Sequence, residues 1–79
     1  MQSGWETLTD ENGQPSILDL NRWQKNTLQK KYSFKALKIV RRDRESGIVM
    51  ISGYKHDFGG RLSGYTGVVL TVRGRVCER

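Results

Sequence analysis

The spacing of hydrophobic residues changes character after residue 31. Up to that point, apolar side chains recur at the three- and four-residue spacing of a helix that buries one side. These side chains are Ile17, Leu20 and Leu28, with Trp23 and Thr27 beside them. Neither glycine nor proline interrupts residues 17–31. The pattern therefore predicts one amphipathic helix over this range, with Trp23 in the core.

Both ends of this predicted helix carry residues that are typical of helix ends. Ser16 and Asp19 form an approximate capping box, and Asp19 also lies near the positive end of the helix dipole. Lys30 and Lys31 fall in the last turn, where cations are favourable. We therefore expect the helix to begin after Ser16.

From residue 32 onward, apolar and polar residues alternate as they do in half-buried strands. Three segments, residues 34–43, 48–55 and 66–77, are predicted strands. A shift in the alternation near Leu37 indicates a bulge, and the DRESG turn contains Gly47, which tolerates positive φ. Three strands in succession predict an antiparallel meander with the helix on one face, so the predicted fold class is α+β.

Two of these segments are apolar on both sides. Residues 48–51 and 68–70 are apolar in succession, which indicates that both faces of the sheet are covered. One helix covers only one face. Three arrangements would cover the second face: the N-terminal arm with Trp5, a sheet that curls into a small barrel, or another protein, including a second copy of the chain.

The chain divides at about residue 15. Residues 1–15 are polar and acidic, and Asn12, Gly13 and Pro15 interrupt regular structure there. We expect this segment to be an irregular arm, with Trp5 packing back onto the domain. Residues 16–79 then form a single small domain.

The cysteine content and hydropathy exclude several classes of protein. Cys77 is the single cysteine, so no internal disulfide can form, and no cluster of Cys and His has the spacing of a metal site. No apolar run approaches the roughly 18 residues needed to span a bilayer, and the polar N-terminus is unlike a signal peptide. We therefore expect a cytoplasmic protein with no metal, no small-molecule cofactor and no membrane partner.

Positive charge is concentrated in the middle of the chain. The net charge is +6, but residues 1–21 contain four acidic residues and no Lys or Arg. Residues 22–44 contain nine Lys or Arg residues and a single acidic residue. This concentration favours a polyanionic partner, most often nucleic acid. The acidic N-terminal segment could also fold over the basic surface and shield it.

The glycine-rich stretch HDFGGRLSGYTG, residues 56–67, approaches two known site patterns and matches neither. The phosphate-loop pattern requires a lysine where Tyr65 stands, and a helix after it. His56, Asp57 and Ser63 include the residue types of a hydrolase triad, but a histidine cannot readily be oriented by the carboxylate next to it in sequence. We therefore expect a flexible connection between strands.

The predicted nucleic-acid-binding residues lie on the strands and in their connections. Arginine suits phosphate because its planar fork donates two hydrogen bonds at once, and tyrosine can stack on an exposed base. The predicted set is Arg41, Arg42, Arg44, Lys55, Arg61, Arg73, Arg75, Tyr54 and Tyr65. The main hypothesis is a small regulatory protein that binds DNA or RNA and is not an enzyme.

Two alternatives stay open at this point. The first is a protein-interaction module, such as an inhibitor, an adaptor or a subunit of a homo-oligomer, which would use the apolar second face of the sheet. The second is a small toxin-type ribonuclease, for which His56, Arg61 and Tyr65 would be the candidate residues.

Overall fold

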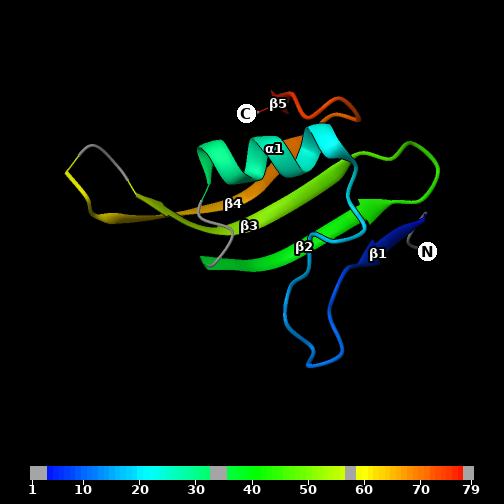
Figure 1. Ribbon diagram of the computed structural model, residues 1–79, viewed down its shortest axis with the longest axis horizontal. Coiled ribbons are helices and arrows are strands. Elements are labelled where there is room, and N and C mark those ends of the chain that lie inside the picture. Colours follow the sequence, from blue (N-terminus) through cyan, green and yellow to red (C-terminus); the bar gives the residue numbers. More distant parts are fainter. Residues whose placement is uncertain (1–3, 33–35, 57–58, 78–79) are drawn as a thin grey trace.

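The computed structural model describes residues 4–32, 36–56 and 59–77. In this part of the chain, a single helix lies against one face of a five-stranded antiparallel sheet (Figure 1). The helix is α1 (Arg22–Lys31). The strands, in their order across the sheet, are β1 (Trp5–Thr7), β2 (Leu37–Asp43), β3 (Val49–His56), β4 (Leu62–Leu70) and β5 (Val76–Cys77).

This arrangement confirms an α+β fold with the helix on one face of the sheet. The predicted number of three strands is wrong, because the sheet gains β1 at one edge and β5 at the other. The sheet is also open, so closure into a small barrel, one of the three arrangements considered for the second face, does not occur. No helix in the described ranges has the length and apolar character required to cross a membrane.

The expectation of an irregular N-terminal arm misses β1. Trp5 pairs with Asp43, and Thr7 pairs with Arg41 on β2. The chain then turns back through a loop that an isolated bridge between Thr9 and Pro15 closes. A strand of three residues is too short to show a period in the sequence. β1 therefore widens the sheet at one edge and does not cover its second face.

The helix begins later than predicted. Asn21 is the N-cap, and its side-chain oxygen accepts a hydrogen bond of 2.9 Å from the backbone N–H of Gln24. Ser16 instead accepts from the backbone N–H of Leu18 and forms a local turn. Gln24 and Leu28 are the buried residues of α1. Trp23 is offset by about a quarter turn from Gln24. It is 51% exposed, and the prediction that it belongs to the core is wrong.

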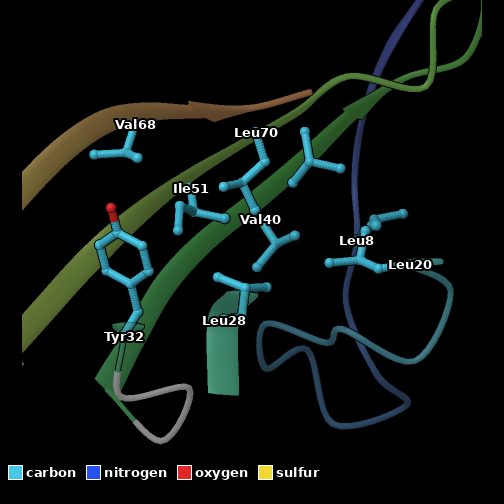
Figure 2. Close-up of a cluster of buried hydrophobic side chains, with 9 residues drawn as sticks. Leu8, Leu20, Leu28, Tyr32, Val40, Ile51, Val68 and Leu70 are labelled. Atoms are coloured by element: carbon cyan, nitrogen blue, oxygen red, sulfur yellow. The ribbon is translucent and has the colours of Figure 1, made fainter. Parts of the chain in front are cut away.

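Buried side chains fill the space between α1 and the sheet (Figure 2). Leu28 comes from the helix, while Val40, Ile51 and Leu70 come from three neighbouring strands. Gln24 is buried among them, and its amide donates to the carbonyl oxygens of Gly47 and Thr71 at 3.0 and 3.1 Å. Burial of this amide is acceptable because both of its N–H groups have partners.

Two irregularities in pairing shape the long strands. The register of β2 against β3 shifts between Leu37 and Ile39, which confirms the predicted bulge. The register of β3 against β4 shifts near Gly67, whose φ is +66° and whose N–H donates to the Ser52 hydroxyl. Most of the glycine-rich stretch is therefore strand. The connection predicted there is reduced to the residues between His56 and Leu62, of which residues 57 and 58 lie outside the described part of the chain.

Candidate nucleic-acid interface

Strand alternation sorts the predicted site residues onto two opposite faces of the sheet. Val40, Ile51 and Val68 pair in one row and face α1. Side chains one position along each strand point away from the helix. We call this second side the open face, and its members are Trp5, Thr7, Ile39, Arg41, Asp43, Met50, Ser52, Tyr54, His56, Leu62 and Val69.

Arg42 and Arg44, two of the three arginines at the β2–β3 hairpin, are held by a carboxylate on β1. Arg42 Nη2 lies 2.7 Å from Glu6 Oε1, and Arg44 Nε lies 3.0 Å from Glu6 Oε2. Hydrogen bonds from these two arginines lower the pKa of Glu6. Arg42 also donates to the backbone carbonyl of Asp19 at 2.7 Å. Acidic N-terminal residues therefore shield the basic hairpin at these two positions.

Arg41 lies on the open face, whereas its neighbours Val40 and Arg42 lie on the side of the sheet that faces α1. It is exposed, and it stands between Thr7 on β1 and Met50 on β3. Tyr54 lies on the same face, where the ammonium of Lys38 is 4.8 Å from its ring centroid. The ring of Tyr54 also covers Gly64 on the neighbouring strand. The structure thus separates the hairpin arginines instead of gathering them.

Tyr65 points toward the core and is not placed to stack on a base. Its ring centroid lies 4.9 Å from that of Tyr32. Its buried hydroxyl has no hydrogen-bond partner among the described residues, and burial raises its pKa. Lys55 is on the same side of the sheet, with its ammonium 5.4 Å from the Tyr32 ring centroid. Arg61 is exposed, immediately before β4.

Arg73 and Arg75 are not on a strand, because β4 ends at Leu70. The prediction of one strand over residues 66–77 is therefore wrong. They flank Gly74 in the turn 71–75, which packs against the first part of α1. Asn21 Nδ2 donates to the carbonyl oxygen of Val72, and Thr27 Oγ1 donates to that of Gly74, both at 2.6 Å. Gly74 approaches so closely that an added Cβ would lie 2.5 Å from the Trp23 carbonyl oxygen.

The turn and the helix together carry several cations on exposed or half-buried positions. The indole of Trp23 is exposed there, with the guanidinium carbon of Arg22 at 5.6 Å from the ring centroid. Neither α1 nor the turn 71–75 contains an acidic residue. We call this the helix surface, and its members are Arg22, Trp23, Lys25, Lys30, Lys31, Arg73 and Arg75.

Sequence reasoning identified only Arg73 and Arg75 of this surface. The signal for the other cations was present, because residues 22–31 contain four Lys or Arg and no acid. Trp23 was missed since its neighbours in the apolar pattern implied burial. The docking of the turn onto α1 joins residues 47 positions apart in sequence, and no local pattern reports such a contact.

The described residues do not form a metal-binding cluster, and they separate the ribonuclease candidates. No group of three or more His, Cys, Asp or Glu side chains lies close enough to hold a metal ion in this part of the chain. His56 is exposed, with Nδ1 at 3.2 Å from the carbonyl oxygen of Gly60. By strand alternation His56 faces away from α1, whereas Tyr65 faces the core. These two ribonuclease candidates are therefore on opposite faces.

Comparison of the chain with protein-family models, with curated proteins and with solved structures finds no match. Function is therefore argued from the residues and their arrangement.

Proposed function

We propose that this protein binds nucleic acid through the helix surface, as a small non-enzymatic binding protein. The observation that carries the proposal is the exposed Trp23 among cations of α1 and the turn 71–75, two segments without an acidic residue. Lys and Arg side chains that neutralise phosphates release condensed counterions, and this release drives association with nucleic acid.

The arrangement of the cations supports contact with a phosphate backbone. Arg73 and Arg75 lie on either side of Gly74, which contacts the main chain of Trp23. Hydrogen bonds from Asn21 and Thr27 fix this turn on the helix. Two arginines are thereby presented from a rigid support beside α1, and guanidinium groups recognise phosphate oxygens in a bidentate manner. The hairpin arginines Arg42 and Arg44 are less suited, because Glu6 already holds them.

A salt titration tests this proposal. We expect the wild-type protein to bind labelled DNA or RNA in fluorescence anisotropy, with an association constant that falls steeply as salt concentration rises. Binding that does not occur at low ionic strength, or that does not respond to salt, would contradict the proposed function.

The open face supports a second candidate function, namely association with a protein. Exposed apolar side chains are distributed along it, including Trp5, Ile39, Tyr54 and the 60% exposed Leu62. Such a patch is typical of interaction surfaces, and a second copy of the chain is the first partner to examine. Light scattering should then report a dimer whose population falls in an Ile39→Asp variant. A monomer at all concentrations would exclude self-association.

We place this activity in the cytoplasm, as a further proposal. The one cysteine, Cys77, is exposed and free. A chain whose fold does not depend on a disulfide retains its structure in a reducing compartment. Expression in a reducing and in an oxidising compartment, followed by urea unfolding, would test this point, and equal midpoints are expected.

A further inference from the structure

We propose that α1 enters the major groove of double-stranded DNA and contacts base edges there. This inference rests on the proposed nucleic-acid-binding function and assigns its substrate class. The juxtaposition that carries it is a row of base-reading side chains along the outer side of α1, with cations on both flanks.

The outer row consists of Arg22, Asn26 and Gln29. Their spacings of four and three residues place them on one side of a helix. Gln24 and Leu28 are buried under the opposite side, and all three residues of the outer row are exposed. The side-chain amides of Asn26 and Gln29 form no hydrogen bond within the described part of the chain. Their donors and acceptors are therefore available to a ligand.

These three side-chain types match the chemistry of base edges in the major groove. Arginine donates two hydrogen bonds to O6 and N7 of guanine, and asparagine or glutamine pairs with N6 and N7 of adenine. A surface that served only to neutralise phosphate would not need two amides at its centre, because an amide carries no charge. The outer row thus combines sequence-reading groups with a positively charged surround.

Cations on the two flanks of α1 are placed to contact the phosphates that border the groove. Lys25 lies on one flank of the outer row. Lys30 lies on the other flank, where Gly74 brings Arg73 and Arg75 against the helix. An α-helix with its side chains is about 10–12 Å wide, and the major groove of B-DNA is about 12 Å wide. The ten residues of α1 span about 15 Å, enough for roughly four base pairs.

The same geometry disfavours double-stranded RNA. The major groove of A-form RNA is deep and narrow, and side chains cannot reach its base edges. The turn 71–75 stands beside α1 and would meet the border of such a groove before the outer row reached a base. We therefore expect duplex DNA to be preferred over duplex RNA.

Binding to three probes of matched length and composition tests the substrate class. With duplex DNA, duplex RNA and single-stranded DNA, we expect the duplex DNA to bind at least about tenfold more tightly than the other two. Methyl green, which occupies the major groove, should displace the protein, whereas the minor-groove ligand distamycin should not. Equal affinity for the three probes, or displacement by distamycin alone, would overturn the inference.

An amide-deletion pair tests the reading residues themselves. Wild-type protein is first used to select preferred sequences from a random duplex pool. For the Asn26→Ala/Gln29→Ala variant, the ratio of affinity for the selected sequences to affinity for random duplex should fall about tenfold, and the salt dependence of binding should not change. Asn12→Ala/Gln14→Ala removes two exposed amides from the loop 9–15, which lies away from α1 (Figure 1), and should select the wild-type sequences. Unaltered selection by the first variant would overturn the inference.

The two proposals fail in different ways. Salt-dependent binding that is equal for the three probes would leave the proposed function standing and would overturn the assignment to the major groove. Absence of binding to all three probes at low salt would overturn both.

Discussion

At the scale of single residues, Glu6 and Tyr65 each lie in surroundings that shift the pKa of the side chain and affect stability. Glu6 accepts hydrogen bonds from two arginines that lie 36 and 38 positions away in sequence. Tyr65 has a buried hydroxyl without a partner in the described residues. The Glu6 hydrogen bonds join β1 to the hairpin between β2 and β3. The buried Tyr65 hydroxyl lowers stability, because it has lost its hydrogen bonds to water.

Replacement of Glu6 should change how stability depends on pH. The pKa of Glu6 is lowered from its ordinary value of 4.5 by hydrogen bonds from Arg42 and Arg44. A carboxyl group whose pKa is lowered by folding stabilises the protein above its unfolded pKa, and this contribution is lost as the pH falls through the folded value. Urea midpoints of wild type and Glu6→Gln should therefore differ near neutral pH and converge below 4.5. A difference that stays constant down to acid pH would contradict the ion pairs.

Removal of the Tyr65 hydroxyl should stabilise the protein. The buried oxygen gives up its hydrogen bonds to water without gaining a partner among the described residues, and phenylalanine does not have this cost. We expect Tyr65→Phe to raise the free energy of unfolding by about 1 kcal/mol, measured by urea denaturation. A loss of stability of the same size would show that the hydroxyl is hydrogen-bonded.

At the scale of elements, the contact between the turn 71–75 and α1 decides where the charges lie. Gln24, Asn21 and Thr27 all form hydrogen bonds with this turn. The contact fixes Arg73 and Arg75 beside the helix. It also explains why Gln24, a polar residue, occupies a buried position of α1.

Substitution of Gly74 should disrupt this contact. Gly74 has a φ of +80°, and an added Cβ would lie 2.5 Å from the Trp23 carbonyl oxygen. Gly13 has a similar φ of +77° with nothing within 4 Å, so Gly13→Ala measures the cost of the backbone conformation alone. We expect about 1 kcal/mol for Gly13→Ala and about 3 kcal/mol for Gly74→Ala, both from urea denaturation. Equal costs would show that the turn yields without strain.

The hydrophobic pattern predicted the central elements well and the peripheral ones poorly. β2 and β3 lie within two or three residues of their predicted ranges, because each has enough residues to show a period. β1 has three residues and pairs with a strand more than 30 positions away. β5 has two residues and lies within the predicted third strand 66–77, which in the structure is divided by the turn 71–75. The helix start was misplaced because the spacing of Ile17 and Leu20 fits the turn before α1 equally well.

The sequence predicted the chemistry of the candidate site, which is positive charge, but not its location in the structure. Positive charge indicated a polyanion, and Arg73 and Arg75 remain in the proposed interface. Arg42 and Arg44 do not, because their pairing with Glu6 spans more than 30 residues and leaves no local signal. Trp23 is exposed because Gln24 and Leu28 occupy the buried side of α1. The burial of Gln24 depends on hydrogen bonds to Gly47 and Thr71, which are distant in sequence.

At the scale of the whole molecule, the two sides differ in chemistry. α1 and the turn 71–75 present cations with an exposed indole, whereas the open face is more apolar, with Arg41 near its middle. This division separates the proposed nucleic-acid interface from the proposed protein interface. The two proposed interfaces therefore lie on opposite sides of the sheet (Figure 1).

The most direct measurement compares two variants that each lose two positive charges from exposed positions, on opposite sides of the molecule. Arg73→Ala/Arg75→Ala should weaken nucleic-acid binding and reduce the slope of log K against log salt by about two units. Lys38→Ala/Arg41→Ala, on the opposite side, should leave both the affinity and the slope close to wild type. If the second variant loses as much affinity as the first, or more, the helix surface is not the nucleic-acid interface.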